Sequence, residues 1–167
     1  MLVRQVAEDE WPVVAWLYQA FRHDLSPVVL GFPYADGRYR HSQLDDYPGP
    51  GKVGYVAWEP HPNTGEQSPV AFALVDGLDE EERELAAFFV VPATRRFGTG
   101  SELAADVIAR HPGRWRVAFQ HENVAAGKFW RSVAEACFGT WTEERVRVPG
   151  RADAPDDHVI RSSPGPS

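Results

Sequence analysis

Cysteine is almost absent from this sequence of 167 residues, which contains only Cys137. A single cysteine excludes a disulfide framework and a cluster of thiolate metal ligands. The six histidines lack the spacing of metal ligands, so we expect no metal site. No hydrophobic run has membrane-spanning length, and no apolar stretch of a leader peptide follows Met1–Gln5. These absences predict a cytoplasmic protein without a membrane partner.

Basic residues are also scarce relative to acidic ones. The sequence has 17 Lys and Arg against 24 Asp and Glu, which gives a net charge of −7. This balance argues against nucleic acid or an anionic membrane surface as the main partner, and it suits an amine substrate. The sequence has no Gly-x-Ser-x-Gly motif, so a serine hydrolase of the nucleophile-elbow type is excluded.

The pattern of apolar residues predicts an α+β fold with a mixed sheet. A strand and a helix come first, then a long irregular segment, three strands, a helix, a strand, a helix and two closing strands. The strands are expected at residues 2–7, 53–58, 69–75, 84–91, 115–120, 141–148 and 157–161, and the helices at residues 9–25, 40–46, 102–111 and 123–138. We predict one domain over residues 1–161 and a disordered tail at residues 162–167.

A basic turn that contains two glycines, at residues 95–101, separates the fourth strand from the next helix. Unpaired N–H groups at a helix start, together with the helix dipole, favour a phosphate or pyrophosphate there. A dinucleotide-binding unit would place this turn after its first strand, and a P-loop would need a lysine where Ser101 follows Gly100. Both of those folds are excluded. Arg95 and Arg96 either add charge to the anion site or form a solvated basic turn, and the glycines beside them favour the anion site.

With these residues in place, the chain resembles the GNAT superfamily of N-acetyltransferases. That family carries Gln/Arg-x-x-Gly-x-Gly/Ala after a strand ending in Val-x-Pro, and here Val90-Val91-Pro92 precedes Arg95-Arg96-Phe97-Gly98-Thr99-Gly100. A second match is Asn123-x-x-Ala126-x-x-Phe129-Trp130, on the helix after the next strand. The order of elements is the third, and the three together make the resemblance specific.

Three shorter stretches also resemble a bacterial group of predicted acetyltransferases of unassigned substrate. They are Asp36-Gly37-Arg38-Tyr39, Phe72-Ala73-Leu74-Val75 and Pro112-Gly113-Arg114-Trp115.

The resemblance implies a mostly antiparallel sheet of about seven strands with helices on both faces, splayed between the fourth and fifth strands. It implies acetyl-CoA as cofactor, with the pyrophosphate on the turn and the pantetheine arm between the splayed strands. Asn123 either donates a hydrogen bond to that arm or only caps the helix, and the two roles are compatible. The residues implied to bind the cofactor are Phe89, Val90, Val91, Arg95, Arg96, Phe97, Gly98, Thr99, Gly100, Ser101, Asn123, Phe129 and Trp130.

Acyl transfer to an amine needs a base that removes a proton from the ammonium. Glu84 lies eleven residues before Arg95, the spacing at which several family members carry a catalytic Glu. It could instead be a solvated member of the acidic run at residues 79–84. His121 is the alternative base or acid, or a plain loop histidine. Trp130 stands where family members often have a Tyr that serves as the acid, and an indole cannot donate a proton as a phenol does.

The long segment at residues 26–52 is rich in aromatic and acidic residues, which would suit a pocket for a cation. Phe32, Tyr34 and Tyr39 are therefore candidate substrate-binding residues, although these rings could equally cover one end of the core. We expect direct acetyl transfer to a primary amine of a small molecule, such as an antibiotic or a metabolite, by a monomer or homodimer. The alternative is a regulatory or structural protein that binds acyl-CoA but has lost catalysis.

Overall fold

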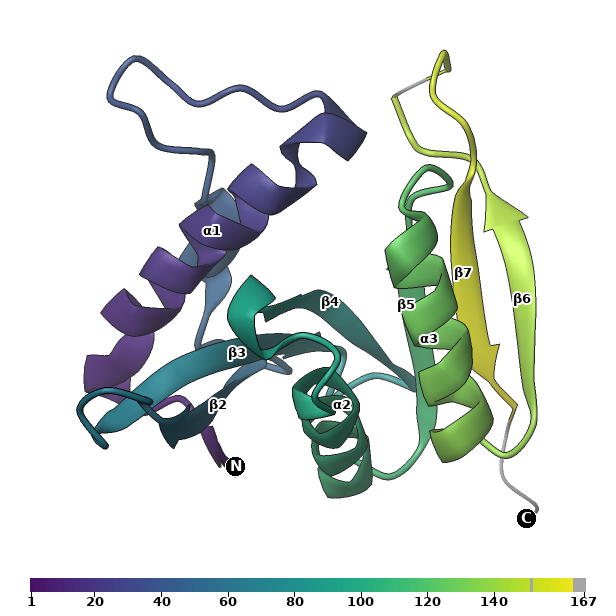
Figure 1. Cartoon of the computed structure of the whole chain (residues 1–167). Coiled ribbons are helices and arrows are strands. Elements are labelled where there is room, and N and C mark those ends of the chain that lie inside the picture. Colours follow the sequence, from purple (N-terminus) through teal and green to yellow (C-terminus); the bar gives the residue numbers. More distant parts are fainter. Residues whose placement is uncertain (151, 164–167) are drawn as a thin grey trace.

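The computed structural model describes residues 1–150 and 152–163, and its centre is a seven-stranded mixed sheet in the order β1-β2-β3-β4-β5-β7-β6 (Figure 1). Among the strands of the described residues, only β4 and β5 pair in parallel. The strands are β1 (Leu2–Gln5), β2 (Val53–Pro60), β3 (Gln67–Asp76), β4 (Glu82–Val90), β5 (Arg114–Phe119), β6 (Trp141–Val146) and β7 (Asp157–Ser162). The predicted mixed sheet is confirmed.

Helices cover both faces of the sheet, each through one apolar stripe. The helices are α1 (Trp11–Val29), α2 (Thr99–Arg110) and α3 (Val124–Cys137), and short 3₁₀ turns lie at η1 (Glu8–Glu10), η2 (Ser42–Asp46) and η3 (Pro92–Thr94). Val14 and Tyr18 of α1 are buried with Phe72 on one face. Leu103 of α2 and Val133 of α3 are buried with Trp115 on the other. This arrangement of three helices places α1 opposite α2 and α3.

The sheet opens between β4 and β5. These strands pair only from Glu82–Arg114 to Leu85–Val117, so residues 86–90 of β4 have no partner on β5. Figure 1 shows the two strands diverging beyond this point. The predicted splay between the fourth and fifth strands is therefore present, and we call it the splay from here on.

Helix α1 is longer than its apolar spacing predicts, because it continues past residue 25 to Val29. Pro27 lies inside the helix and has no N–H to donate to the carbonyl of His23. The hydroxyl of Ser26 donates to that carbonyl instead, at 2.7 Å. This replacement lets one more turn of helix form, and that turn reaches the splay.

The predicted disordered tail is wrong at its first residue. Ser162 ends β7, is buried, and its hydroxyl accepts a hydrogen bond from the N–H of Trp115 at 2.8 Å. Ser163 donates its N–H to the carbonyl of Thr140. The rest of the predicted tail, residues 164–167, lies outside the described residues.

Candidate active site

A cavity of about 770 Å³ passes through the splay and is walled from both faces of the sheet. One wall, the α1 wall, consists of Phe21, Asp24, Leu25 and Val28. The opposite wall, the α3 wall, consists of Asn123, Ala125, Ala126, Phe129 and Trp130. Between them lie residues of β4 and of the glycine turn, namely Phe88, Phe89, Val90, Arg95, Arg96, Gly98, Gly100 and Ser101.

The glycine turn presents a row of free backbone donors to this cavity. Among the described residues, no N–H of residues 96–101 donates a hydrogen bond to a backbone or side-chain acceptor. The N–H groups of residues 99–101 belong to the first turn of α2, where a helix has no internal acceptor for them. We call these six consecutive groups the cradle; they lie at the positive end of the α2 dipole, where free N–H groups could hold an anion.

Two glycines shape the cradle for different reasons. Gly98 has φ +96°, a left-handed conformation that a residue with a side chain adopts only under strain. At Gly100 a Cβ atom would lie 3.2 Å from Phe129 and 3.3 Å from Val90. The start of α2 can therefore approach α3 and β4 closely, and the cradle opens directly beside the edge of β4.

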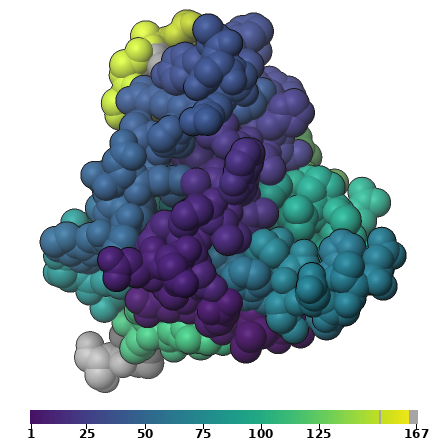
Figure 2. Space-filling model, turned by 90° about the vertical axis from the view of Figure 1, so that its left-hand side faces the viewer, coloured from purple at the N-terminus to yellow at the C-terminus, as the bar shows by residue number. Residues whose placement is uncertain are grey.

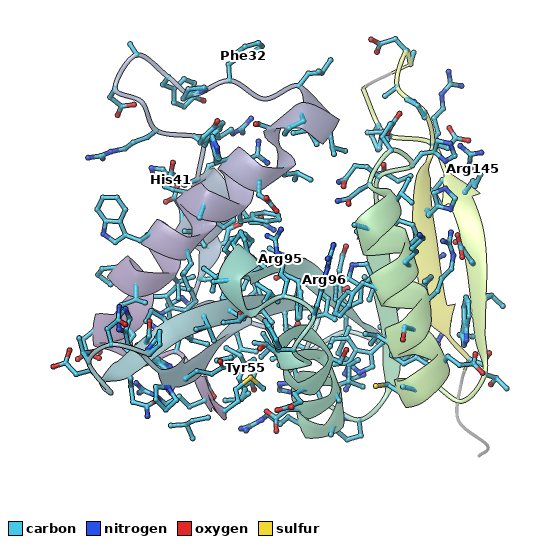
Figure 3. The ribbon with its side chains drawn as sticks, viewed as in Figure 1. Phe32, His41, Tyr55, Arg95, Arg96 and Arg145 are labelled. Carbon is cyan, nitrogen blue, oxygen red and sulfur yellow. The ribbon has the colours of Figure 1, made fainter. Side chains whose placement is uncertain are left out.

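The two arginines of the turn have different surroundings. Arg95 folds back toward α1: its Nε donates to the carbonyl of Val90 at 2.8 Å, and its Nη2 donates to Asp24 at 2.7 Å. Its guanidinium also lies 5.5 Å from the centroid of the Phe89 ring. Arg96 is exposed, and Figure 3 shows both side chains in the space between α1 and α3. Arg95, expected to add charge to the anion site, is thus held in this structure by Val90, Asp24 and the Phe89 ring.

The register of β4 with β3 determines which backbone groups of β4 face the splay. Val91 donates its N–H to the carbonyl of Val70, in the direction of β3. Because backbone groups alternate along a strand, Phe89 also faces β3, whereas Phe88 and Val90 face the splay. In this register the backbone groups of Phe89 and Val91, which were expected to contact the cofactor, point toward β3 and not into the splay. Phe89 contributes its ring to the cavity, and Val91 does not line it.

Aromatic rings of α3 form the wall that faces Phe88. The Trp130 ring lies 5.0 Å from the Phe88 ring and 4.7 Å from the Phe129 ring, both edge-to-face. Asn123 caps α3, because its Oδ1 accepts the N–H of Ala126 at 3.2 Å. This bond leaves the amide N–H groups of Asn123 to donate into the cavity. The cap is thus present, and a second role for the same side chain remains open.

Phe97 and Thr99 belong to the cradle through their backbone, but their side chains do not line the cavity. Thr99 is buried, and its hydroxyl donates to Glu59 of β2 at 3.0 Å. The Phe97 ring is 82% exposed. Only the backbone N–H groups of these two residues can take part in the predicted anion site.

Neither candidate base lines the cavity. Glu84 lies one residue before Leu85, the last residue of β4 that pairs with β5. Its carboxylate lies 3.5 Å from the guanidinium of Arg116, its register partner on β5. His121 follows β5, is exposed, and its Nδ1 lies 2.9 Å from Nε2 of His158. His158 in turn lies 2.6 Å from Glu143, so His121 begins a chain of three polar side chains that leads to β6.

The carboxyl group of Glu143 ends this chain as a permanent acceptor. The two hydrogen bonds from Arg131, at 2.8 and 2.7 Å, lower its pKa to about 2, and the bond to His158 acts in the same direction. His158 also stacks on Phe119, with ring centroids 5.1 Å apart. Within the described residues, no group of three His, Cys, Asp or Glu is arranged to hold a metal ion.

The aromatic residues predicted to bind substrate lie away from the cavity. Phe32 is 88% exposed and Tyr34 is 63% exposed. Tyr39 is bound to the outer side of α1, where its N–H donates to Gln19 and its hydroxyl lies 3.1 Å from His23. Figure 2 shows this segment spread over the outer face of the molecule beside α1, and Figure 3 places Phe32 on the loop beyond α1. These three residues do not meet the cradle in this structure.

The sequence reasoning missed the α1 wall and Phe88. Residues 21, 25 and 28 have helical spacing, which is the signal that could have found this wall. The signal was lost because Pro27 and the polar residues near it argued that the helix ends at residue 25.

Comparisons with known proteins identify the fold. No protein-family model matches the chain, and no curated protein matches its sequence. Solved structures do match it. One is a protein from Corynebacterium glutamicum described as histone acetyltransferase HPA2 and related acetyltransferase. It has a TM-score of 0.69 and 13% identity, over 99% of this chain and 97% of that one.

Two further structures extend this likeness. A GNAT-family acetyltransferase from Staphylococcus aureus has a TM-score of 0.61 and 13% identity, over 96% of both chains. A ribosomal-protein-alanine N-acetyltransferase from Brucella melitensis has a TM-score of 0.63 and 18% identity, over 96% of this chain and 98% of that one. The chain therefore has the fold of the GNAT acetyltransferases.

Proposed function

We propose that this protein is an N-acetyltransferase that transfers an acetyl group from acetyl-CoA to a primary amine of a small molecule by direct transfer. The observation that carries the proposal is that the cradle and the free edge of β4 line the same cavity, which has α1 as its wall on one face of the sheet and α3 on the other. The fold, which it shares with acetyltransferases of several organisms, supports the same activity. We place the reaction in the cytoplasm and expect a monomer or homodimer.

The residues present fit the chemical parts of acetyl-CoA. The six N–H groups of the cradle suit a pyrophosphate, to which Arg96 would add a positive charge. Two carbonyl groups of β4 near Phe88 already accept hydrogen bonds from side chains. Gln43 donates to the carbonyl of Ala86 at 3.3 Å, and Arg95 donates to the carbonyl of Val90. Phe88 can therefore pair with the amide groups of the pantetheine arm, and Asn123 can donate to the same arm.

Acetyl-CoA, when bound, supplies the acetyl group as a thioester. The amine nitrogen must lose a proton before it bonds the acetyl carbon while the carbon–sulfur bond breaks, and the products are an amide and a thiol. Glu84 is the leading base. Of the carboxylates on β4, it lies closest to Leu85, where the pairing of β4 with β5 ends and the splay begins. A water molecule would carry the proton to it, because Glu84 does not line the cavity. His121 is the second candidate.

The departing thiolate has no phenol beside it. Trp130 occupies the wall position from which a Tyr could donate a proton, and its indole only packs on Phe88 and Phe129. Among the described lining residues, the only carboxylate is Asp24, and no Tyr, Cys or His is present. We therefore propose that the thiolate leaves without a dedicated acid.

Two measurements test this function. Acetyl-CoA at about 100 times its Kd should stabilise the folded protein by about 2.7 kcal/mol and raise the Tm by roughly 5–10 °C. A thiol-release assay over a panel of primary amines should then show turnover that requires both acetyl-CoA and an amine. Absence of a Tm shift at saturating acetyl-CoA would remove the basis of the proposal.

Trp130 and the distance of both bases from the cavity favour one alternative, a protein that binds acyl-CoA for regulation or structure without catalysis. This alternative predicts the same Tm shift but no thiol release with any amine. The two assays together therefore separate it from the enzyme.

A further inference from the structure

The α1 wall has a different chemistry from the rest of the cavity. Phe21, Leu25 and Val28 line it with apolar side chains at helical spacing, and each is only partly buried because it faces the open space. The Phe89 ring extends this apolar surface, in contact with Phe21 at a ring distance of 6.3 Å. This wall lies on the face of the sheet opposite α2 and α3. It is thus across the splay from the cradle.

One carboxylate interrupts this apolar surface. Asp24 accepts the Nη2 donor of Arg95 with its Oδ2 at 2.7 Å, and its side chain is 48% exposed. Among the described residues, its Oδ1 has no hydrogen-bond donor. The free oxygen can accept a hydrogen bond from an ammonium that enters beside the apolar residues.

The charges of the cavity limit how many positive groups a ligand can bring. Asp24 is the single carboxylate among the described lining residues, and Arg95 and Arg96 face the same space. A polyamine or an aminoglycoside would place its second and third ammonium groups against apolar side chains or arginines. A ligand with one ammonium and an apolar remainder satisfies both features of the wall.

An acyl chain longer than acetyl is the other apolar group that could lie on this wall. Such a chain brings no cation, and it would cover the free oxygen of Asp24 without a partner, which is unfavourable. The presence of the carboxylate thus favours the amine as the occupant.

Resting on the proposed function, we propose that the acceptor is a primary amine on an apolar alkyl or aryl group, with its ammonium on Asp24 and its apolar part on Phe21, Leu25 and Val28. The amine arrives protonated, and Asp24 holds it while a proton leaves to solvent or to the base. Asp24 is thus a binding residue of the acceptor.

Calorimetric titration of amines into the full-length protein saturated with CoA tests this proposal without requiring turnover. The probes are butylamine, hexylamine, phenylethylamine, spermidine and kanamycin. Each buried methylene should tighten binding roughly four-fold, so hexylamine, with two more methylenes, should bind about 15-fold more tightly than butylamine. Spermidine and kanamycin should bind more weakly than hexylamine. Tighter binding of spermidine or kanamycin, or no binding of any amine, would overturn the proposal.

Matched variants locate the binding. Asp24→Asn should weaken hexylamine binding roughly ten-fold or more, as expected for a charge-assisted hydrogen bond. Its control is Asp106→Asn, which breaks a similar Asp–Arg ion pair, also at 2.7 Å, on α2 outside the cavity. Leu25→Gln should weaken hexylamine binding by a similar factor, whereas Leu30→Asn, at an exposed residue of the same helix end, should not. Equal effects in variant and control would contradict the assignment.

The same panel in the thiol-release assay separates this proposal from the proposed function. If hexylamine binds in a manner that depends on Asp24 but releases no thiol, the amine site on the α1 wall stands and the enzyme is excluded. If spermidine both binds best and is acetylated, the enzyme stands and the acceptor assignment is wrong. Faster thiol release from octanoyl-CoA than from acetyl-CoA, with no dependence on amine length, would assign the α1 wall to the acyl chain.

Discussion

The cradle and the α1 wall face the same cavity but are built in different ways. The cradle consists of backbone N–H groups at the start of α2, and its geometry is set by two glycines. The α1 wall consists of side chains on a helix that packs on the opposite face of the sheet. A backbone site binds what is common to many ligands, such as a phosphate, whereas a side-chain wall selects by shape and charge. Under the proposed function, the cradle would thus be the general half of the cavity and the α1 wall the selective half.

The largest effect is expected from a change in the cradle. Gly98→Asp forces a left-handed conformation on a residue with a side chain, and its carboxylate lies beside Glu102 at the anion site. We expect acetyl-CoA affinity to fall roughly 100-fold or more, because several charge-assisted hydrogen bonds are lost. Calorimetry with acetyl-CoA measures this change.

Gly65→Asp is the control for backbone strain. Gly65 also has a left-handed conformation, φ +74°, but lies in the turn between β2 and β3 with open space around it. This variant should bind acetyl-CoA with the affinity of the parent. An equal loss in both variants would mean that Gly98 acts only on folding.

The two candidate bases give the next largest effect. If Glu84 removes the proton, Glu84→Gln should lower kcat by roughly 100-fold near neutral pH and leave acetyl-CoA affinity unchanged. Glu82→Gln removes a neighbouring carboxylate that pairs with Arg114 and Arg161, and it should change kcat little. A large loss in His121→Gln with none in Glu84→Gln would transfer the role to His121.

Trp130 tests whether the missing phenol limits the rate. Trp130→Tyr introduces a hydroxyl at the α3 wall, and Trp130→Phe makes a similar change in size without it. Because we propose that the thiolate leaves without an acid, the Tyr variant should have a kcat roughly ten-fold higher than the Phe variant. Equal kcat values would show that protonation of the thiolate is not limiting.

The smallest effect lies outside the cavity, at Glu143. Its pKa is lowered to about 2 in the folded protein from an ordinary value of 4.5, chiefly by Arg131. A lowered carboxyl pKa stabilises the folded state above pH 4.5, and this stabilisation is lost as the pH falls toward 2. The contribution should be about 1 kcal/mol near neutral pH, since the Arg131 side chain is 43% exposed and solvent screens the pair.

Urea unfolding of the parent and of Glu143→Gln at several pH values measures that contribution. The difference in free energy of unfolding should shrink as the pH falls from 4.5 to 2. Acetyl-CoA should raise the Tm of both proteins equally at neutral pH, because Glu143 touches neither the cradle nor the α1 wall. A pH-independent difference would contradict the assigned ion pair.

The cradle could be predicted from the sequence because its determinants are local. Gly98 and Gly100 follow an apolar strand and begin a helix within a few residues, so the conformation of the turn is encoded where it forms. Local patterns predicted the order of elements along the chain, whereas the splay was implied by the family resemblance. Backbone sites of this kind leave a trace in the sequence itself.

The spacing of the α1 wall is present in the sequence, but its place in the cavity could not be predicted, because the contacts that set it join distant segments. The bond between Arg95 and Asp24 spans 71 residues, and it turns toward α1 an arginine that the sequence placed at the phosphate. Which residues of β4 face the splay depends on their register with β3, which shifts at Leu74 and Val75. The pairing of Glu84 with Arg116 likewise arises only when β4 and β5 meet. Tertiary packing sets all three.

A crystal structure with acetyl-CoA bound tests the central claim most directly. We predict that the pyrophosphate accepts hydrogen bonds from the N–H groups of residues 96–101 and that the pantetheine arm pairs with Phe88 in the splay. The acetyl group should then lie between Trp130 and the α1 wall. A pyrophosphate bound elsewhere, or a pantetheine arm outside the splay, would contradict the assignment of this cavity as the site of acetyl transfer.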